Sequence, residues 1–158
     1  MDYFYDNLDK VFEKIIKKAV KPDMEVRCVT DLNESELDHL IEKGIDGVII
    51  DVDETLRFNS GDIPLENDMW LDMLVSKMDV IALSDGYDKK IKDNLKEKGI
   101  DYLGFGLKPF RLNFLRACFK LKKSPMKVAV IGDDLWADIH GGNKNNMMTI
   151  KVSEEKKR

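Results

Sequence analysis

Apolar residues near the N-terminus recur with the period of a helix, whereas those further along the chain fall into short continuous runs. From residue 3 to residue 20 the apolar side chains keep to one helical face, and Lys21-Pro22 would end the helix. The members of this apolar stripe are Phe4, Leu8, Val11, Phe12, Ile15, Ile16 and Ala19. We expect residues 1–20 to form an amphipathic helix whose stripe docks on the rest of the protein or on a second subunit.

Strand-like and helix-like segments alternate after this first helix. Residues 24–30 alternate as a strand does, and residues 34–43 are typical of a helix with Gly44 at its C-cap. Further strands are predicted at residues 47–51, 80–84, 102–105, 128–132 and 148–152, and further helices at residues 65–77, 87–98, 110–121 and 135–142. This alternation predicts an α/β fold, a Rossmann-like three-layer α/β/α parallel sheet. Without a convincing linker, residues 21–158 should form one core domain.

Polar side chains gather directly after four of the predicted strands. These strand ends deliver carboxylates, a hydroxyl and a lysine: Asp51, Asp53 and Thr55; Ser84 and Asp85; Lys108; and Asp133 and Asp134. Ligands of open parallel sheets bind beyond the carboxyl ends of the strands, so we expect these side chains to converge on one site.

Carboxylates clustered beside a buried strand are costly unless something neutralises them. Mg²⁺ takes oxygen ligands, and Asp51 and Asp133 could supply two of them. A lysine could hold phosphoryl oxygens as charge develops, while a serine hydroxyl and the amides of the loop at Asp85-Gly86 bind the others. One carboxylate could then act as nucleophile, and another two residues on as general acid and base. Alone, the D-x-D-x-T run at residues 51–55 also occurs in calcium loops and exposed turns.

The polar motifs, in this order, resemble the four motifs of the haloacid dehalogenase (HAD) superfamily. Longer stretches resemble the YqeG-like branch of HAD subclass IIIA phosphatases, namely "KPDMEVRCVTDLN", "KGIDGVIIDVDETL", "LKPF" and "GDDLWADIHGGNKNNMMTI". Together they span about residues 21–152. The resemblance implies a Rossmann-like fold and Mg²⁺-dependent hydrolysis of a phosphomonoester. A related mitochondrial branch acts on phosphatidylglycerophosphate, which suggests a substrate to test.

The resemblance also implies a role for each matching residue. Asp51 would be the nucleophile and a metal ligand, and Asp53 the general acid and base with its backbone carbonyl on the metal. Thr55 would support the motif loop. Ser84 would bind phosphate, and Lys108 would stabilise the phosphoaspartate.

The last motif and two departures from the family pattern leave choices open. Asp133 would bind Mg²⁺ and Asp138 would support the metal or the lysine, although Asp134 could replace Asp133 if the loop shifts. Asp85 stands where relatives commonly have asparagine, so it either points away from the phosphate or changes substrate preference. Arg57 stands where many relatives are apolar, and it either reaches an anionic substrate or is solvated.

The spacing of the motifs leaves no room for a large cap domain. About 30 residues separate Asp51 from Ser84, and about 25 separate Ser84 from Lys108, which the core's own helix and strand fill. An open, capless site suits a large or surface-presented substrate, such as a lipid, better than a small metabolite.

Composition and charge limit the partners and the cellular compartment that we expect for this protein. The formal net charge of -4 gives no overall footprint for nucleic acid. Two cysteines, Cys28 and Cys118, favour buried thiols and a reducing cytoplasm over a disulfide framework. No apolar run is long enough to span a bilayer, although contact of the N-terminal helix with a membrane surface stays open.

Two other classes of function compete with a phosphatase. A receiver-like phospho-accepting signalling module also uses aspartates, a hydroxyl and a lysine on a parallel sheet. Its motifs come in a different order, because its acidic pair lies on the first strand and not after the lysine. A protein that binds partners while retaining HAD motifs is the third alternative.

Overall fold

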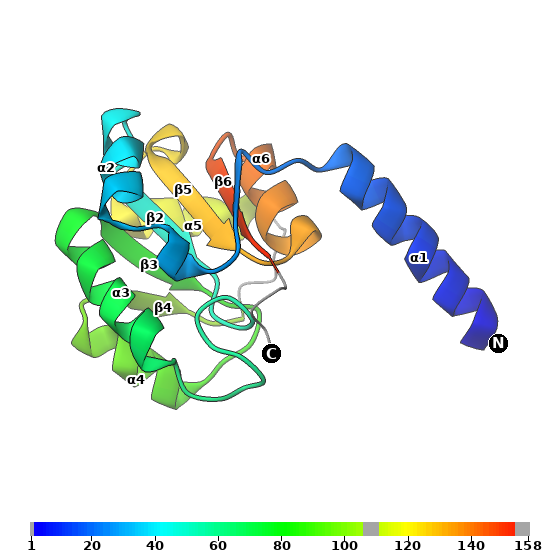
Figure 1. Cartoon of the computed structure of the whole chain (residues 1–158), viewed down its shortest axis with the longest axis horizontal. Helices are drawn as coiled ribbons and strands as arrows, with labels where there is room; N and C mark the ends of the chain where they lie inside the picture. Colours follow the sequence, from blue (N-terminus) through cyan, green and yellow to red (C-terminus); the bar gives the residue numbers. More distant parts are fainter. Residues whose placement is uncertain (1, 106–110, 154–158) are drawn as a thin grey trace.

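The computed structural model describes residues 2–105 and 111–153, and these residues form one six-stranded parallel sheet with helices on both faces (Figure 1). The strands are β1 (Met24–Val26), β2 (Gly47–Ile50), β3 (Asp79–Leu83), β4 (Asp101–Leu103), β5 (Val128–Gly132) and β6 (Met148–Val152). Their order across the sheet is β1-β6-β5-β2-β3-β4, and every neighbouring pair is parallel. The predicted Rossmann-like α/β architecture is confirmed.

The helices follow the predicted pattern with small shifts at their ends. They are α1 (Asp2–Ala19), α2 (Glu34–Glu42), α3 (Leu65–Lys77), α4 (Lys89–Glu97), α5 (Arg111–Leu121) and α6 (Gly141–Lys144), with shorter helical segments η1 (Val29–Asp31), η2 (Pro125–Lys127) and η3 (Leu135–His140). The strand predicted at 24–30 ends at Val26 because the chain turns into η1, where the Asp31 carboxylate accepts a hydrogen bond from the Arg27 backbone N–H.

The helix predicted at 135–142 is built as η3, which is π-helical, followed directly by α6. Gly141 and Gly142 therefore begin a helical turn and do not end one. A β-carbon on Gly142 would lie 2.7 Å from the Thr149 side chain and 3.1 Å from that of Val130. The missing side chain lets α6 pack closely on β5 and β6.

The alternation along the central strands divides the core into two layers. Val48 and Ile50 of β2 are buried in the cluster that contains Leu71 of α3. Ile49 points to the other face, where it packs in the cluster of Phe114 and the thiol-bearing Cys118 of α5. Each fully buried aliphatic side chain contributes about 1.5–3 kcal/mol, so β2 is held firmly from both sides. The carboxyl end of this strand is therefore a rigid place for a site.

Helix α1 projects from the body of the protein, and only its C-terminal end packs on the described core (Figure 1). Ile16 and Val20 are buried against Ile139 of η3. Other members of the stripe are about half exposed, with fractions between 49% and 58%: Leu8, Val11, Phe12 and Ile15. Ile16 thus docks on the core, and Phe12 contacts Trp136 of η3, whereas docking of the other exposed members on a second subunit stays a prediction. No helix in the described residues is both long and apolar enough to cross a membrane.

The connections after β2 and β3 carry no inserted domain. Residues 51–64 join β2 to α3, and residues 84–88 join β3 to α4. The structure thus has no large cap in these two places, as the motif spacing predicts.

Candidate active site

The predicted motif residues lie where the strand order of the sheet changes direction. In the register of the sheet, Ile50 of β2 pairs with Ala82 of β3 on one side and with Ile131 of β5 on the other. Asp51 comes directly after β2, Ser84 directly after β3, and Asp133 directly after β5. Parallel α/β sheets bind ligands at such a point, because the loops on either side diverge and leave a crevice.

Three carboxylates converge in this crevice. Asp51, Asp133 and Asp138 each offer one oxygen atom, and these atoms all lie within 4.8 Å of one another. Asp51 and Asp138 are buried, with exposed fractions of 8% and 1%. Like charges this close and this buried repel each other strongly, and a hard divalent cation with oxygen ligands would remove that repulsion. The cluster is therefore a candidate metal centre.

Thr55 orients the first of these carboxylates. Its buried hydroxyl donates a hydrogen bond of 3.0 Å to Asp51 Oδ2, and the same hydroxyl lies 3.5 Å from Asp133 Oδ1. A tight turn presents the hydroxyl, since the backbone N–H of Leu56 donates to the Val52 carbonyl at 2.9 Å. Thr55 thus lies among the carboxylates and links the end of β2 to the end of β5.

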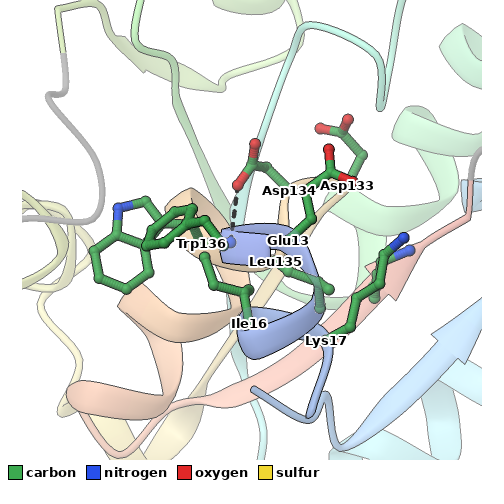
Figure 2. A pocket seen from close by; sticks show the side chains of 9 residues that line it. Glu13, Ile16, Lys17, Asp133, Asp134, Leu135 and Trp136 are labelled. Atoms are coloured by element: carbon green, nitrogen blue, oxygen red, sulfur yellow. Dashed lines mark hydrogen bonds between the residues drawn. The ribbon is translucent and has the colours of Figure 1, made fainter. Parts of the chain in front are cut away.

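Asp133 and Asp134 are neighbours in sequence with different surroundings. Asp134 is the N-cap of η3, because its Oδ1 accepts hydrogen bonds from the backbone N–H groups of Trp136 at 2.8 Å and Ala137 at 2.7 Å. Figure 2 draws the bond to Trp136 as a dashed line. Asp138 Oδ2 in turn accepts from the Asp134 backbone N–H at 3.2 Å. Of the two aspartates, the geometry favours Asp133 as the metal ligand.

Asp53 belongs to a separate arrangement centred on Arg57. The Arg57 guanidinium donates from Nε to Asp53 Oδ1 at 2.8 Å and from Nη1 to Asp88 Oδ2 at 2.7 Å. Burial lowers the pKa of Arg57, but its hydrogen bonds to Asp88 and Asp53 outweigh burial and hold that pKa above its ordinary value. Arg57 is only 8% exposed, so the expectation of a solvated side chain is wrong.

The loop after β3 faces the same crevice. Ser84 is buried, and its backbone N–H donates to the Leu103 carbonyl at 2.9 Å. Asp85 is exposed, yet it lines a cavity of about 130 Å³ together with Asp51, Asp53, Asp133, Asp134, Ala137 and Asp138. The Gly86 carbonyl accepts hydrogen bonds from the Phe105 N–H and the Tyr102 hydroxyl, which fixes the loop. Lys108 lies outside the described residues.

A larger pocket adjoins this cavity and brings α1 to the site. Its volume is about 480 Å³, and it is lined by Phe12, Glu13, Ile16, Lys17, Asp133, Asp134, Leu135, Trp136 and Lys151. Figure 2 shows Trp136 and Lys17 on opposite sides, with Asp133 and Asp134 at the rim between them. The Phe12 and Trp136 rings meet edge to face at 6.0 Å. The polar motifs did not predict that Phe12 and Trp136 form one wall of this pocket. The sequence feature that could have indicated it is the amphipathic stripe of the N-terminal helix.

Two sequence comparisons show which proteins this chain resembles. The model of a family described as HAD-hydrolase-like matches residues 107–158. The chain is also 28% identical over 142 residues to "Probable phosphatase YqeG" of Bacillus subtilis, which covers 87% of this chain and 80% of the relative. The chain is thus similar to HAD-like hydrolases and to a phosphatase.

Solved structures share the HAD fold of this chain. An uncharacterized protein from Listeria monocytogenes superposes with a TM-score of 0.57 at 18% identity, over 72% of this chain and 84% of that one. The 3-deoxy-D-manno-octulosonate 8-phosphate phosphatase of Moraxella catarrhalis superposes with a TM-score of 0.50 at 21% identity, over 65% of each chain. That structure was determined with a magnesium ion and a phosphate ion.

The HAD motifs account for the carboxylate cluster but not for everything around it. The pairing of Asp53 with Arg57 and Asp88 joins the first motif to the start of α4, and the larger pocket joins the last motif to α1. Both arrangements depend on residues between or before the motifs, so they became visible only in the structure.

Proposed function

We propose that this protein hydrolyses a phosphomonoester with the help of Mg²⁺, through a phosphoaspartate formed on Asp51. Its class is that of a HAD-type phosphatase, in keeping with its relatives. The observation that carries the proposal is the cluster of Asp51, Asp133 and Asp138, whose oxygen atoms lie within 4.8 Å of one another at the carboxyl end of the sheet.

The donor set of the cluster fits Mg²⁺ in kind. All three side chains offer carboxylate oxygens, which hard divalent cations prefer. Asp51 and Asp133 would be the ligands, the backbone carbonyl of Asp53 would join them, and Asp138 would support them. When bound, Mg²⁺ would neutralise the carboxylates and the phosphoryl oxygens, so that two negatively charged groups can approach each other.

Asp51 would carry the phosphoryl group. Thr55 holds its Oδ2 by a hydrogen bond and fixes the orientation of the carboxylate. An Asp51 oxygen forms a bond to phosphorus while the bond from phosphorus to the ester oxygen breaks, and Asp53 gives its proton to the departing alcohol. In the second half, Asp53 takes a proton from water. The water oxygen bonds to phosphorus, the bond to Asp51 breaks, and phosphate leaves.

The remaining phosphoryl oxygens need donors around them. Ser84 is buried directly after β3, and its hydroxyl is a suitable donor there. The backbone of the Asp85-Gly86 loop is the second source. Lys108, as the family resemblance implies, would supply the positive charge that stabilises the developing phosphoaspartate.

The larger pocket supports an amphiphilic substrate. Phe12, Ile16 and Trp136 give it apolar surface, while Lys17 and Lys151 add positive charge beside Asp133. A phosphomonoester whose alcohol carries acyl chains would meet both kinds of surface, and the absence of a cap after β2 or β3 leaves room for it. Phosphatidylglycerophosphate is therefore the substrate we propose to test first.

A substrate panel tests this proposal. Phosphate release would be measured with Mg²⁺ and with chelator from phosphatidylglycerophosphate in mixed micelles, a sugar phosphate, a nucleotide and a phosphopeptide. We expect many turnovers per protein molecule, dependence on Mg²⁺, and the highest kcat/KM with the lipid. Phosphate release that chelator leaves unchanged would overturn the proposed dependence on Mg²⁺. A single turnover per protein molecule would favour a receiver-like module. A higher kcat/KM with a soluble substrate than with phosphatidylglycerophosphate would overturn the proposal of a lipid substrate.

A further inference from the structure

We infer that Arg57 is a positioning residue that holds the Asp53 carboxylate for proton transfer to the leaving alcohol, anchored by Asp88 at the start of α4. The inference rests on the proposed function, because it gives Asp53 a partner in the same reaction. It assigns Arg57 to the enzyme's own carboxylate and not to an anionic substrate.

The first support is the geometry of Arg57 itself. A guanidinium presents its N–H groups in a rigid plane, so two fixed partners fix its orientation. Arg57 Nε bonds Asp53 at 2.8 Å and Nη1 bonds Asp88 at 2.7 Å, and Nη1 also lies 3.5 Å from the Gly61 carbonyl oxygen. The arginine side chain is 9% exposed, whereas that of Asp53 is 46% exposed. The buried arginine can therefore hold a carboxylate that still reaches solvent and substrate.

The second support is the anchoring of Asp88. Its Oδ1 accepts a hydrogen bond of 3.2 Å from the Ile91 backbone N–H and so caps α4. Its own N–H donates to the Tyr102 hydroxyl at 3.2 Å. Asp88 is thus fixed by a helix start and a strand residue, and Arg57 transmits that fixed position across the crevice to Asp53.

The third support is the conformation of the loop between Asp53 and Arg57. Glu54 has a φ of 60°, in the left-handed region that non-glycine residues rarely adopt. Its N–H donates to the Arg57 carbonyl at 2.8 Å, and its Oε1 accepts from the Asn59 N–H at 2.9 Å. Such a conformation persists only where the surroundings determine it, and Arg57 ties both ends of this loop together.

The expected consequence is a selective one. An alcohol that is a poor leaving group needs its proton from Asp53, whereas 4-nitrophenolate leaves readily without one. Removing Arg57 should therefore slow the first step with an alkyl phosphate much more than with 4-nitrophenyl phosphate. A purely structural role would slow both substrates equally.

The experiment compares kcat/KM for glycerol 3-phosphate and 4-nitrophenyl phosphate in the full chain and in Arg57→Met. We expect a loss of about 10- to 100-fold with the alkyl ester and of less than about threefold with the aryl ester. Arg57→Lys should recover part of the loss with the alkyl ester. Equal losses with both substrates, or no loss with either, would overturn the inference.

A control and a structural readout separate this inference from the proposed function. Lys123 also bridges two aspartates, Asp46 at 3.4 Å and Asp79 at 3.1 Å, but at the amino ends of β2 and β3. In Lys123→Met, kcat/KM should change by the same factor with both substrates. Hydrolysis that persists in Asp51→Asn would instead refute the proposed function.

Crystal structures give an answer that needs no activity. In Arg57→Met the Asp53 carboxylate should change rotamer or lose its defined position while Asp51 stays in place. An unchanged Asp53 carboxylate would overturn the positioning role.

Discussion

The carboxyl group of Asp138 occupies the space in which a side chain on Gly132 would begin. A β-carbon built on Gly132 would overlap the Asp138 carboxyl, and no other residue type could stand at this position without displacing it. Gly132 ends β5, and Asp138 lies in the following helical segment. The glycine therefore lets the third carboxylate reach the ends of β2 and β5.

Gly132→Ala should move Asp138 and weaken the metal centre. We expect a loss of stability of about 1–3 kcal/mol from overpacking and a higher Mg²⁺ concentration for half-maximal activity. Gly142→Ala is the matched control, since its methyl group would crowd Thr149 and Val130 and not a carboxylate. Thermal unfolding and Mg²⁺ titrations check both variants. Equal Mg²⁺ requirements in the two would contradict the account.

Asp133 and Asp134 should differ sharply when each is changed to asparagine. Asp133→Asn removes a charge from the cluster, so activity at fixed Mg²⁺ should fall by about 100-fold, and added Mg²⁺ should restore part of it. Asp134→Asn keeps a good N-cap and should cost less than about threefold. A larger loss of activity in Asp134→Asn than in Asp133→Asn would make Asp134, and not Asp133, the metal ligand.

The extent of the sequence prediction can be judged from particular residues. The strands at 128–132 and 148–152 match β5 and β6 in both bounds, because β-branched runs buried on both faces carry a strong local signal. The order of the motifs favours Asp133 as the metal ligand. Only the hydrogen bonds of Asp134 to Trp136 and Ala137, which no sequence pattern reveals, set Asp134 apart.

Long-range contacts were beyond the sequence patterns. Asp88 meets Arg57 across 31 positions of sequence, so no local pattern joins them. Phe12 belongs to a stripe that predicts a helix, but the period does not reveal that this helix borders the carboxylates. Pairings of this kind depend on how whole elements pack, which a helical or strand period does not encode.

The Arg57–Asp88 pair should add a pH-dependent contribution to stability. The hydrogen bond from Arg57 lowers the pKa of Asp88 below its ordinary value of 3.8. A lowered carboxyl pKa stabilises the fold above that ordinary value, and the contribution disappears as pH falls through the folded-state pKa. Asp88→Asn keeps the cap of α4 but loses the charge. It should be less stable than the parent by about 0.5–1 kcal/mol near neutral pH, with a smaller gap at about pH 3. Urea unfolding at both pH values checks this, and a gap that widens in acid would contradict it.

The wall formed by Phe12 and Trp136 should matter for large amphiphilic substrates alone. Trp136→Ala removes one side of the pocket and should raise KM for phosphatidylglycerophosphate micelles by about 10-fold, with little change for 4-nitrophenyl phosphate. Phe119 is a suitable control, because it is 84% exposed on α5 and away from this pocket. A similar rise in Phe119→Ala, or an effect on both substrates, would argue against a substrate-binding wall.

The phosphoaspartate on Asp51 can be located directly. The protein would be mixed with an excess of 4-nitrophenyl phosphate and Mg²⁺, quenched in acid within the first turnovers, reduced with borohydride and digested for mass spectrometry. Reduction converts an acyl phosphate on aspartate to homoserine and thereby marks the residue that carried the phosphoryl group. The account predicts homoserine at position 51, more of it in Asp53→Asn and none in Asp51→Asn. Homoserine at another aspartate, or sustained hydrolysis by Asp51→Asn, would contradict it.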